Sequence, residues 1–325
     1  MNAGRIAAII PFFNRQQSLL ATLRCVESQT HLPSQLVLVD DGSTDRGAEV
    51  VTDWIEQLHG RFDCRLLRKP NGGAASARNH GLSQAQPSEY VAFLDSDDHW
   101  PADFLARTQA ALAAHPTAVA ATCDRRFVFA DGRKNKLESC SPIAQAPSLW
   151  LLERGAGIAS CTLFRRSEVE RQGGFDLTLP TGQDAALYLP LTLRGPWLYV
   201  AGEAVDFSRG VAQHAGDEGN LSQKYADSHL AWAQIYEEFF VRRGGQAWLS
   251  HPRCRRTLAR RWFQAGRQLL RLGAHHKALA SFRKSRAWNP WKARYYAGLF
   301  RAWFAMRSRS STDSYAASQA TATLR

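Results

Sequence analysis

The residues best suited to chemistry in this sequence are acidic side chains that directly follow apolar runs. Asp95, Asp97 and Asp98 come immediately after the run at residues 90–94, with Ser96 between the first two. Carboxylates that project together repel one another and are costly to desolvate, and a bound divalent cation removes that penalty. Hard oxygen ligands favour Mg²⁺ or Mn²⁺, and either ion can stabilise a departing diphosphate. The same segment would also suit a turn that caps the next helix.

A second acidic pair, Asp40 and Asp41, closes the apolar run at residues 35–40 and is followed by Gly42. A carboxylate at the end of a strand can accept a hydrogen bond from the imide N–H of a base or from a ribose hydroxyl. Glycine lets the backbone pass close to a ligand. Because Asp-Gly-Ser-Thr is also a common turn composition, a nucleotide-contacting loop and a plain turn are both open.

Two further segments contain candidate residues. Residues 71–81 are rich in small side chains, which let the start of a helix lie close to a ligand, and Arg78 could offer a forked cation to a phosphate or a base carbonyl. Asp184 follows Gly182 and Gln183 at the expected start of a helix. A carboxylate there could act as a general base toward a hydroxyl, although an acid at that place is also typical of a helix N-cap.

Alternating strands and helices are expected to position these residues. Apolar runs predict strands at residues 5–11, 35–40, 64–67 and 90–94, and helical spacing predicts helices at 18–28, 48–58, 74–85 and 104–115. This alternation indicates an α/β protein with an open parallel sheet and right-handed crossovers. Since ligands of such sheets bind beyond the carboxyl ends of the strands, both acidic clusters are expected to face one crevice.

Beyond residue 115 the alternation weakens. We expect strand segments within residues 118–129 and 157–164, a loop at 130–147, a turn at 173–176 and a helix from Asp184. From Ser228 the chain is expected to be helical, and its Ser-, Thr- and Ala-rich tail from Ser308 is expected to fray.

The overall charge favours anionic partners. The chain has 325 residues and a formal net charge of +12, with Arg and Lys dense at residues 242–309 and Asp concentrated in the first 100 positions. Its 6 cysteines form no Cys-x-x-Cys pair, which favours buried thiols in a reducing compartment. No apolar run reaches the roughly 18 residues of a spanning helix. We therefore expect a cytoplasmic protein, or one held peripherally on the cytosolic face of the inner membrane.

Six segments together resemble the family 2 glycosyltransferases in their order and spacing. They are residues 9–14, 39–43, 71–81, 93–98, 173–176 and 182–184. The resemblance implies the GT-A fold, a Rossmann-like, mostly parallel sheet flanked by helices, with a helical C-terminal appendage. Residues 1–225 would form the glycosyltransferase domain, with a nucleotide-binding half at 1–115 and an acceptor-binding half at 116–225. Residues 226–325 would form the basic, aromatic-rich appendage.

The resemblance also implies a role for each candidate residue. Those expected to bind the nucleotide sugar are Pro11, Asn14, Asp40, Asp41, Arg78 and Asp95, with Asp41 on the base and Asp95 near the ribose and the metal. Asp97 and Asp98 are the candidate ligands of Mn²⁺ or Mg²⁺, and the sequence does not decide between them. His214 could contact the metal or a phosphate. Asp184 would be the catalytic base, although it follows Gln183 where family members commonly have Glu.

The reaction implied is transfer of a sugar from a nucleotide-diphosphate sugar, with UDP-sugars favoured, to an acceptor hydroxyl with inversion. The acceptor would be a carbohydrate or a lipid-linked glycan, in the synthesis of a cell-surface polysaccharide or glycolipid. A nucleotidyltransferase acting on a sugar phosphate would favour a Gly-rich, basic signature where residues 11–15 read Pro-Phe-Phe-Asn-Arg. A non-catalytic nucleotide-sugar-binding module would lack one or more of the key acids, and all of them are present.

The basic, aromatic segment at residues 253–309 allows two interpretations. Basic amphipathic helices with interfacial aromatic residues often lie on anionic membrane surfaces. Alternatively, the segment is a helical cap whose basic face is simply solvated. No recognised motif supports nucleic-acid binding, so no nucleic-acid partner is expected.

Overall fold

The computed structural model describes residues 4–129, 133, 135–209 and 228–306. The chain divides into two compact units, which are described separately: residues 1–179 with 183–224, and residues 180–182 with 225–325. The tail from Ser308, expected to fray, lies outside the described residues. No helix in the described part combines the length and the apolar character needed to cross a bilayer.

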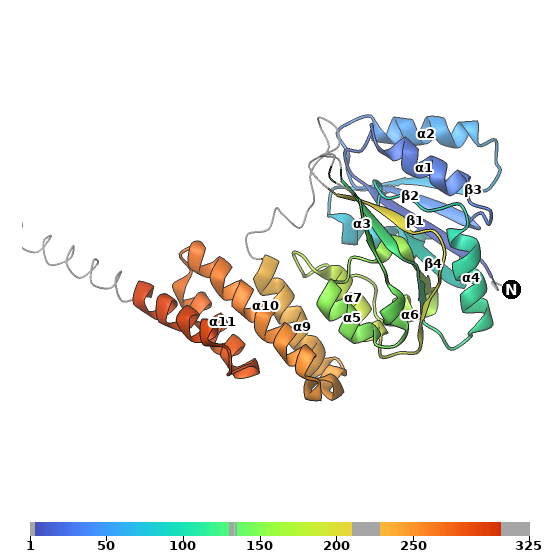
Figure 1. Ribbon diagram of the computed structural model, residues 1–325. Helices are drawn as coiled ribbons and strands as arrows, with labels where there is room; N and C mark the ends of the chain where they lie inside the picture. The colour runs from blue at the N-terminus through green and yellow to red at the C-terminus, as the bar shows by residue number, and fades with distance from the viewer. Residues whose placement is uncertain (1–3, 130–132, 134, 210–227, 307–325) are drawn as a thin grey trace, which may run out of the picture. The chain divides into compact units, whose positions relative to one another are not determined.

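Within the described residues, the first unit is built on a seven-stranded sheet in the order β3-β2-β1-β4-β8-β5-β9. Strands β1 to β4 and the helices beside them can be followed in Figure 1. The strands are β1 (Ile6–Phe12), β2 (Gln35–Asp40), β3 (Asp63–Arg68), β4 (Tyr90–Phe93), β5 (Ala120–Thr122), β8 (Thr162–Arg165) and β9 (Trp197–Tyr199). Strands β3, β2, β1 and β4 are parallel, and β1 and β2 are buried at every position. Strand β8 runs antiparallel between β4 and β5, so the sheet is mostly parallel rather than wholly so.

Helices flank this sheet, which confirms the predicted fold class. They are α1 (Leu19–Glu27), α2 (Gly47–Gln57), α3 (Ala74–Gln84), α4 (Phe104–Ala114), α5 (Pro147–Arg154), α6 (Arg166–Arg171) and α7 (Gln183–Leu191). Helix α3 lies directly on β1 and β2, because Gly81 leaves no side chain between them. A Cβ atom at Gly81 would lie 2.6 Å from Cγ2 of Ile9 and 3.1 Å from Cγ2 of Val39.

A second, three-stranded sheet has the order β10-β6-β7, with β6 at Arg125–Phe129, β7 at Lys136–Glu138 and β10 at Val205–Arg209. The loop predicted at residues 130–147 is therefore wrong in part, because β7 and the short helix η1 (Ser141–Ala144) lie within it. The polar segment pairs as a strand because the guanidinium of Arg125 donates two hydrogen bonds to Glu138, at 2.9 and 2.6 Å.

The second unit is helical. Its elements are α9 (Ser228–Arg242), η3 (Gly245–Ser250), α10 (Pro252–Arg271) and α11 (His275–Trp288), and residues 293–306 form a further helix. A small core of Leu269, Ala278, Phe282 and Ala302 joins the last three helices. The expectation of a helical region from Ser228 is confirmed.

We expect Gly81→Ala to destabilise the protein by about 1–3 kcal/mol, because the new methyl group overpacks the contact of α3 with β1 and β2. Helix propensity alone would stabilise the same substitution by up to about 1 kcal/mol, so the sign of the effect distinguishes packing from propensity. Urea denaturation measures it. Ser83→Ala, at an exposed position of the same helix, is the matched control and should change stability by less than about 0.5 kcal/mol. A stabilised Gly81→Ala variant would contradict the packing argument.

Candidate active site

The carboxyl ends of β1, β2 and β4 meet at one edge of the sheet, since these strands are parallel and adjacent. Asp40 is the last residue of β2, and the loops that follow these strands contain Asn14, Asp41 and Asp95. The structure thus brings the predicted acidic clusters to the same edge, where an open parallel sheet binds its ligands.

Arg78 is the central side chain of the site. It projects from α3, is almost fully buried, and its Nη2 donates a hydrogen bond to Oδ1 of Asp95. Its Nη1 lies 3.6 Å from Oδ1 of Asp184 at the start of α7, and its guanidinium lies 5.3 Å from the ring centroid of Phe175. Burial disfavours the cation, but Asp95 and Asp184 outweigh this effect and raise the pKa of Arg78 above its usual value. A permanent cation therefore joins two acids that are far apart in the sequence.

Asp184 lies in the first turn of α7, where its side chain is 28% exposed. Desolvation raises the pKa of Asp184 to about 6; Arg78 opposes this shift and Asp95 adds to it. A carboxylate with that pKa is largely ionised at neutral pH, yet it is far more basic than an ordinary aspartate. It can therefore accept a proton from a nearby hydroxyl.

Tyr188 lies one turn further along α7, and its ring stacks on Phe164 with a centroid distance of 4.8 Å. Burial, and then the charge of Asp184, raise its pKa well above the usual value. Among the described residues, neither the Tyr188 hydroxyl nor Nε of Arg78 has a hydrogen-bond partner. Buried polar atoms without partners are uncommon. One of these two belongs to Arg78 itself, and the other lies near Asp184 and Arg78.

The turn at residues 173–176 is joined to the site by hydrogen bonds to helix α3. Asn79, the neighbour of Arg78, accepts a hydrogen bond from the N–H of Phe175 at 2.9 Å and donates one to its carbonyl at 2.7 Å. Gly173 and Gly174 have positive φ angles, and a Cβ at Gly174 would lie 2.6 Å from Oδ1 of Asn79. The two glycines therefore let the turn reach α3 and place Phe175 over Arg78, a link that the sequence motif alone did not reveal.

The two candidate metal ligands occupy different environments. Asp98 is buried; it accepts hydrogen bonds from the hydroxyl of Ser160 at 2.6 Å and from the N–H of Ser208 at 3.0 Å. Burial, together with the charges of Asp95 and Asp97, raises its pKa well above the usual value. Asp97 is partly exposed, and its Oδ2 lies 3.6 Å from the guanidinium of Arg15. Asp98 is therefore held in the interior by hydrogen bonds, whereas the carboxylate of Asp97 is accessible to solvent.

At the end of β2, both acids bind the protein itself. Asp40 is fully buried and accepts hydrogen bonds from the N–H of Ser43 at 2.8 Å and from Nε of Arg68 at 2.9 Å. The Asp41 carboxylate accepts from Nζ of Lys69 at 2.6 Å and from the N–H of Gly73 at 2.6 Å. These contacts fold the β2 loop onto the segment after β3.

Pro11 and Asn14 lie at the end of β1. Pro11 is paired with Val39 of β2, and Asn14 has a positive φ of 53°. The amide oxygen of Asn14 accepts a hydrogen bond from the N–H of Thr44 at 2.9 Å, so Asn14 ties the β1 and β2 loops together. His214, the remaining candidate, lies outside the described residues.

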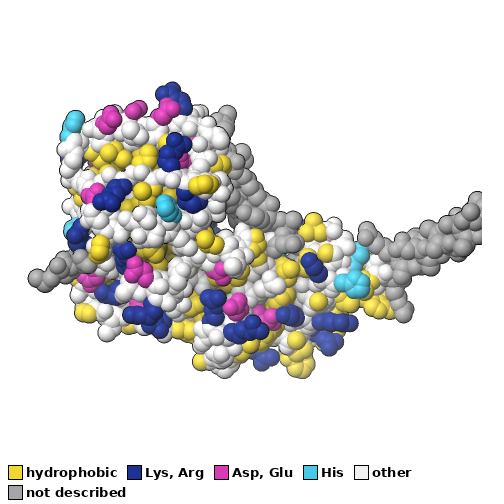
Figure 2. All heavy atoms as spheres, turned by 180° about the vertical axis from the view of Figure 1, so that it is seen from behind, with side chains coloured by type: hydrophobic (Ala, Val, Ile, Leu, Met, Phe, Trp, Pro, Cys, Tyr) yellow, Lys and Arg dark blue, Asp and Glu magenta, His cyan; other side chains and the backbone are white. Residues whose placement is uncertain are grey.

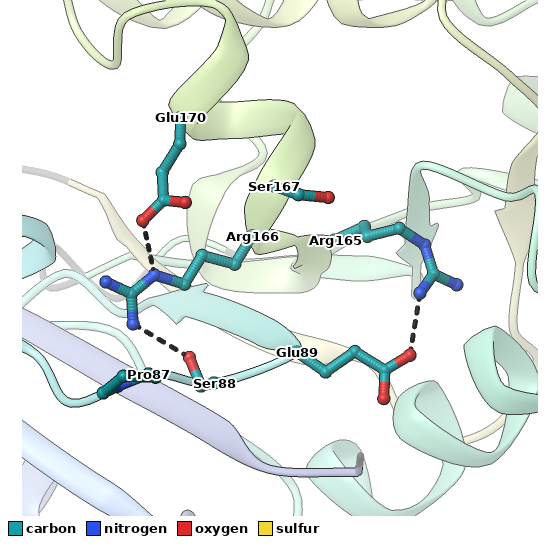
Figure 3. A pocket seen from close by; sticks show the side chains of 7 residues that line it. All are labelled: Pro87, Ser88, Glu89, Arg165, Arg166, Ser167 and Glu170. Carbon is teal, nitrogen blue, oxygen red and sulfur yellow. Dashed lines mark hydrogen bonds and ion pairs between the residues drawn. The ribbon is translucent and has the colours of Figure 1, made fainter. Parts of the chain in front are cut away.

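A cavity of about 540 Å³ lies at the opposite edge of the sheet, next to the segment that enters β4 and the start of α6 (Figure 3). Its charged side chains bind one another: Arg165 pairs with Glu89 at 2.8 Å and Arg166 with Glu170 at 2.7 Å. Arg166 also donates to the carbonyls of Leu82 and Gln86 at the end of α3. Because these groups fasten α6 to α3 and lie away from the acidic loops, this cavity is not the candidate active site.

Comparison with known proteins identifies the family. The family model for glycosyl transferase family 2 matches residues 7–172, about half of the chain. The amylovoran biosynthesis glycosyltransferase AmsB of Erwinia amylovora is 26% identical over 248 residues, which cover 71% of this chain and 80% of AmsB. The putative teichuronic acid biosynthesis glycosyltransferase TuaG of Bacillus subtilis is 38% identical over 100 residues, which cover 31% of this chain but only 38% of TuaG.

Solved structures support the same fold. S. aureus TarS 1-349 in complex with UDP-GlcNAc has a TM-score of 0.58 at 16% identity and covers 95% of this chain and 92% of that one. GalNAc-T7 with UDP, GalNAc and Mn²⁺ has a TM-score of 0.52 at 15% identity, covering 76% of this chain and 50% of that one. At these identities the likeness concerns the fold, which is GT-A. With the family match, the conclusion is that the chain belongs to glycosyl transferase family 2 and is a glycosyltransferase.

Proposed function

We propose that this enzyme transfers a sugar from a nucleotide-diphosphate sugar, with UDP-sugars favoured, to an acceptor hydroxyl with inversion. The main support for this proposal is that Arg78 contacts both Asp95, which follows β4, and Asp184, at the start of α7. This shared contact supports a site in which Asp95 acts on the nucleotide side and Asp184 is the base. Names of relatives support the substrate class: AmsB and TuaG are named for amylovoran and teichuronic acid biosynthesis, and TarS was solved with UDP-GlcNAc.

Asp184 is the base in this proposal. Its carboxylate accepts the proton of the acceptor hydroxyl while the acceptor oxygen forms a bond to the anomeric carbon. The bond from that carbon to the diphosphate oxygen breaks on the opposite side, and the nucleoside diphosphate leaves. A single displacement of this kind inverts the anomeric centre and needs no covalent nucleophile on the protein. Arg78 keeps the base ionised, because its charge opposes the desolvation that raises the pKa of Asp184.

The acids that follow β4 could bind a divalent cation together with the phosphates of the substrate. Asp95 and Asp97 are partly exposed and raise the pKa of buried Asp98, so negative charge accumulates there. Among the described residues, no group of three or more His, Cys, Asp or Glu could hold a metal by itself. Mg²⁺ bound by one or two carboxylates together with substrate phosphates is a common arrangement. We propose Asp97 as the main ligand of Mn²⁺ or Mg²⁺, assisted by Asp95, with the ion stabilising the diphosphate when bound.

In this proposal, the loops after β1 and β2 bind the nucleotide. Pro11, Asn14 and Arg78 line the nucleotide pocket, and Asp41 faces the base. Asp40 supports Asp41 through its bonds to Ser43 and Arg68. His214 is proposed as an additional metal or phosphate contact. The acceptor is a carbohydrate or a lipid-linked glycan of a cell-surface polysaccharide or glycolipid, and the enzyme acts in the cytoplasm, at the cytosolic face of the inner membrane.

A panel of nucleotide sugars, assayed for nucleotide release with Mn²⁺ or Mg²⁺ and a glycan acceptor, tests the reaction class. In Asp184→Asn, kcat should fall by about 10²–10⁴-fold because general-base catalysis is lost. Nucleotide affinity, measured by calorimetry, should be largely unchanged. Gln183→Ala is the neighbouring control and should retain most of the activity. Full transfer by Asp184→Asn would remove Asp184 from the mechanism.

The pH profile tests the electrostatic role of Arg78. Since the ionised form of Asp184 is the base, kcat/KM should fall about tenfold per pH unit below its pKa of about 6. Arg78→Met should move this acidic limb to higher pH, because the cation that lowers the pKa of Asp184 is gone. Arg78→Lys keeps a positive charge and should leave the limb closer to its original position. An identical limb in the wild type and in Arg78→Met would exclude this coupling.

Substituting each candidate metal ligand should separate their roles. Asp97→Asn should weaken nucleotide binding in Mn²⁺ by about tenfold or more and leave binding in EDTA unchanged. Asp98→Asn should leave the metal dependence intact, because Asp98 is bonded to Ser160 and Ser208 inside the fold. Calorimetric titration of UDP with and without Mn²⁺ measures both. The reverse pattern would assign the metal to Asp98.

A further inference from the structure

The C-terminal helices carry the excess positive charge of the whole chain. Residues 251–306 contain 14 Arg and Lys and no Asp or Glu, whereas the rest of the chain holds 27 Lys and Arg against 29 Asp and Glu. Because the segment has no carboxylate of its own, its cations can form ion pairs only with acids elsewhere. Lys284 does so with Glu237 at 2.5 Å.

One face of α10 is a row of exposed arginines. Its members, which recur at spacings of three, four or seven residues, are Arg253, Arg256, Arg260, Arg267 and Arg271. These spacings place side chains on the same side of a helix. From the first to the last member, this arginine row extends over about 27 Å.

The helix at residues 293–306 has two apolar faces; within the described part of the chain one is buried and the other is largely exposed. On the packed face, Tyr295 and Ala302 are buried, and a Cβ at Gly298 would lie 2.7 Å from the Phe282 ring. The other face is an exposed row at positions i, i+4, i+7 and i+8: Tyr296, Phe300, Trp303 and Phe304. We call these four residues, with Trp291 just before the helix, the aromatic ridge.

Three rings of the ridge are neighbours, and a cation lies beside a fourth. The ring of Phe300 lies 6.3 Å from those of both Trp303 and Phe304, and Trp291 is 91% exposed. The guanidinium of Arg286 lies 5.6 Å from the ring of Tyr296. Figure 2 shows Lys and Arg side chains interspersed with apolar ones over the C-terminal helices. Exposed apolar residues usually occur singly, so five exposed aromatic side chains close together in the sequence, with cations among them, indicate a binding surface.

We propose that the aromatic ridge and the arginine row bind the anionic surface of a lipid bilayer. Aromatic side chains are favoured at the headgroup level of a membrane, and Arg and Lys are attracted by anionic headgroups. A second copy of this chain would instead bring two acid-free, cationic segments together, which electrostatic repulsion opposes. The inference goes beyond the proposed reaction and stands independently of the donor and of the role of Asp184.

Flotation of the full-length protein with vesicles tests the proposal. The wild type should float with vesicles that contain phosphatidylglycerol, bind much less to phosphatidylcholine alone, and dissociate as salt is raised. The combined variant Phe300→Ser, Trp303→Ser and Phe304→Ser should lose at least about tenfold in bound fraction. Arg256→Gln, Arg260→Gln and Arg267→Gln together should lower both the binding and its dependence on salt.

A matched control variant removes exposed apolar side chains outside the C-terminal helices. Leu137→Ser with Leu177→Ser, at side chains that are 63% and 57% exposed, should bind vesicles like the wild type. Circular dichroism and UDP binding of each preparation show that its fold is retained. Equal binding by the ridge variant and the wild type, or no preference of the wild type for phosphatidylglycerol, would overturn the proposal. A ridge-dependent dimer in light scattering, without flotation, would assign the ridge to self-association instead. Retained nucleotide release in either case would leave the proposed reaction standing.

Discussion

Arg78 is nearly buried between Asp95 and Asp184, and the rest of the candidate site depends on this arrangement. A buried cation that lost its carboxylates would be strongly destabilising, by about 3–5 kcal/mol for a broken pair. The end of β4, the body of α3 and the start of α7 are therefore constrained to assemble together. The same constraint places Asp184, the candidate base, near Asp95 at the end of β4.

The surroundings of Arg78 explain why small and polar residues accumulate along α3. Gly81 brings the helix against β1 and β2, and Asn79 holds the turn that carries Phe175. Arg166 binds carbonyls at the far end of α3 and fastens α6 to it. One helix thus links the core of the sheet, the aromatic contact of the guanidinium and the cavity at the opposite edge.

Much of this was predictable from the sequence, for physical reasons. Buried parallel strands read as continuous apolar runs, so β1, β2 and β4 and the acids at their ends were located correctly. Which of two adjacent acids points inward was not predictable, because the environment of Asp98 is made by Ser160 and Ser208, which are distant in the sequence. Strand β7 was missed because its exposed side chains lack an apolar pattern. The link from Asn79 to Phe175 was missed because it forms only in the folded chain.

The position of β8 affects how the protein must fold. Strands β1 to β4 lie within the first 93 residues and pair with one another, whereas β5 reaches the sheet only through β8, which ends at Arg165. During synthesis, the backbone edge of β4 is therefore left without its native neighbour until a further 72 residues have been added. Unpaired, apolar strand edges are sites of intermolecular pairing. The late arrival of one antiparallel strand thus defines an aggregation-sensitive interval in the biogenesis of this enzyme.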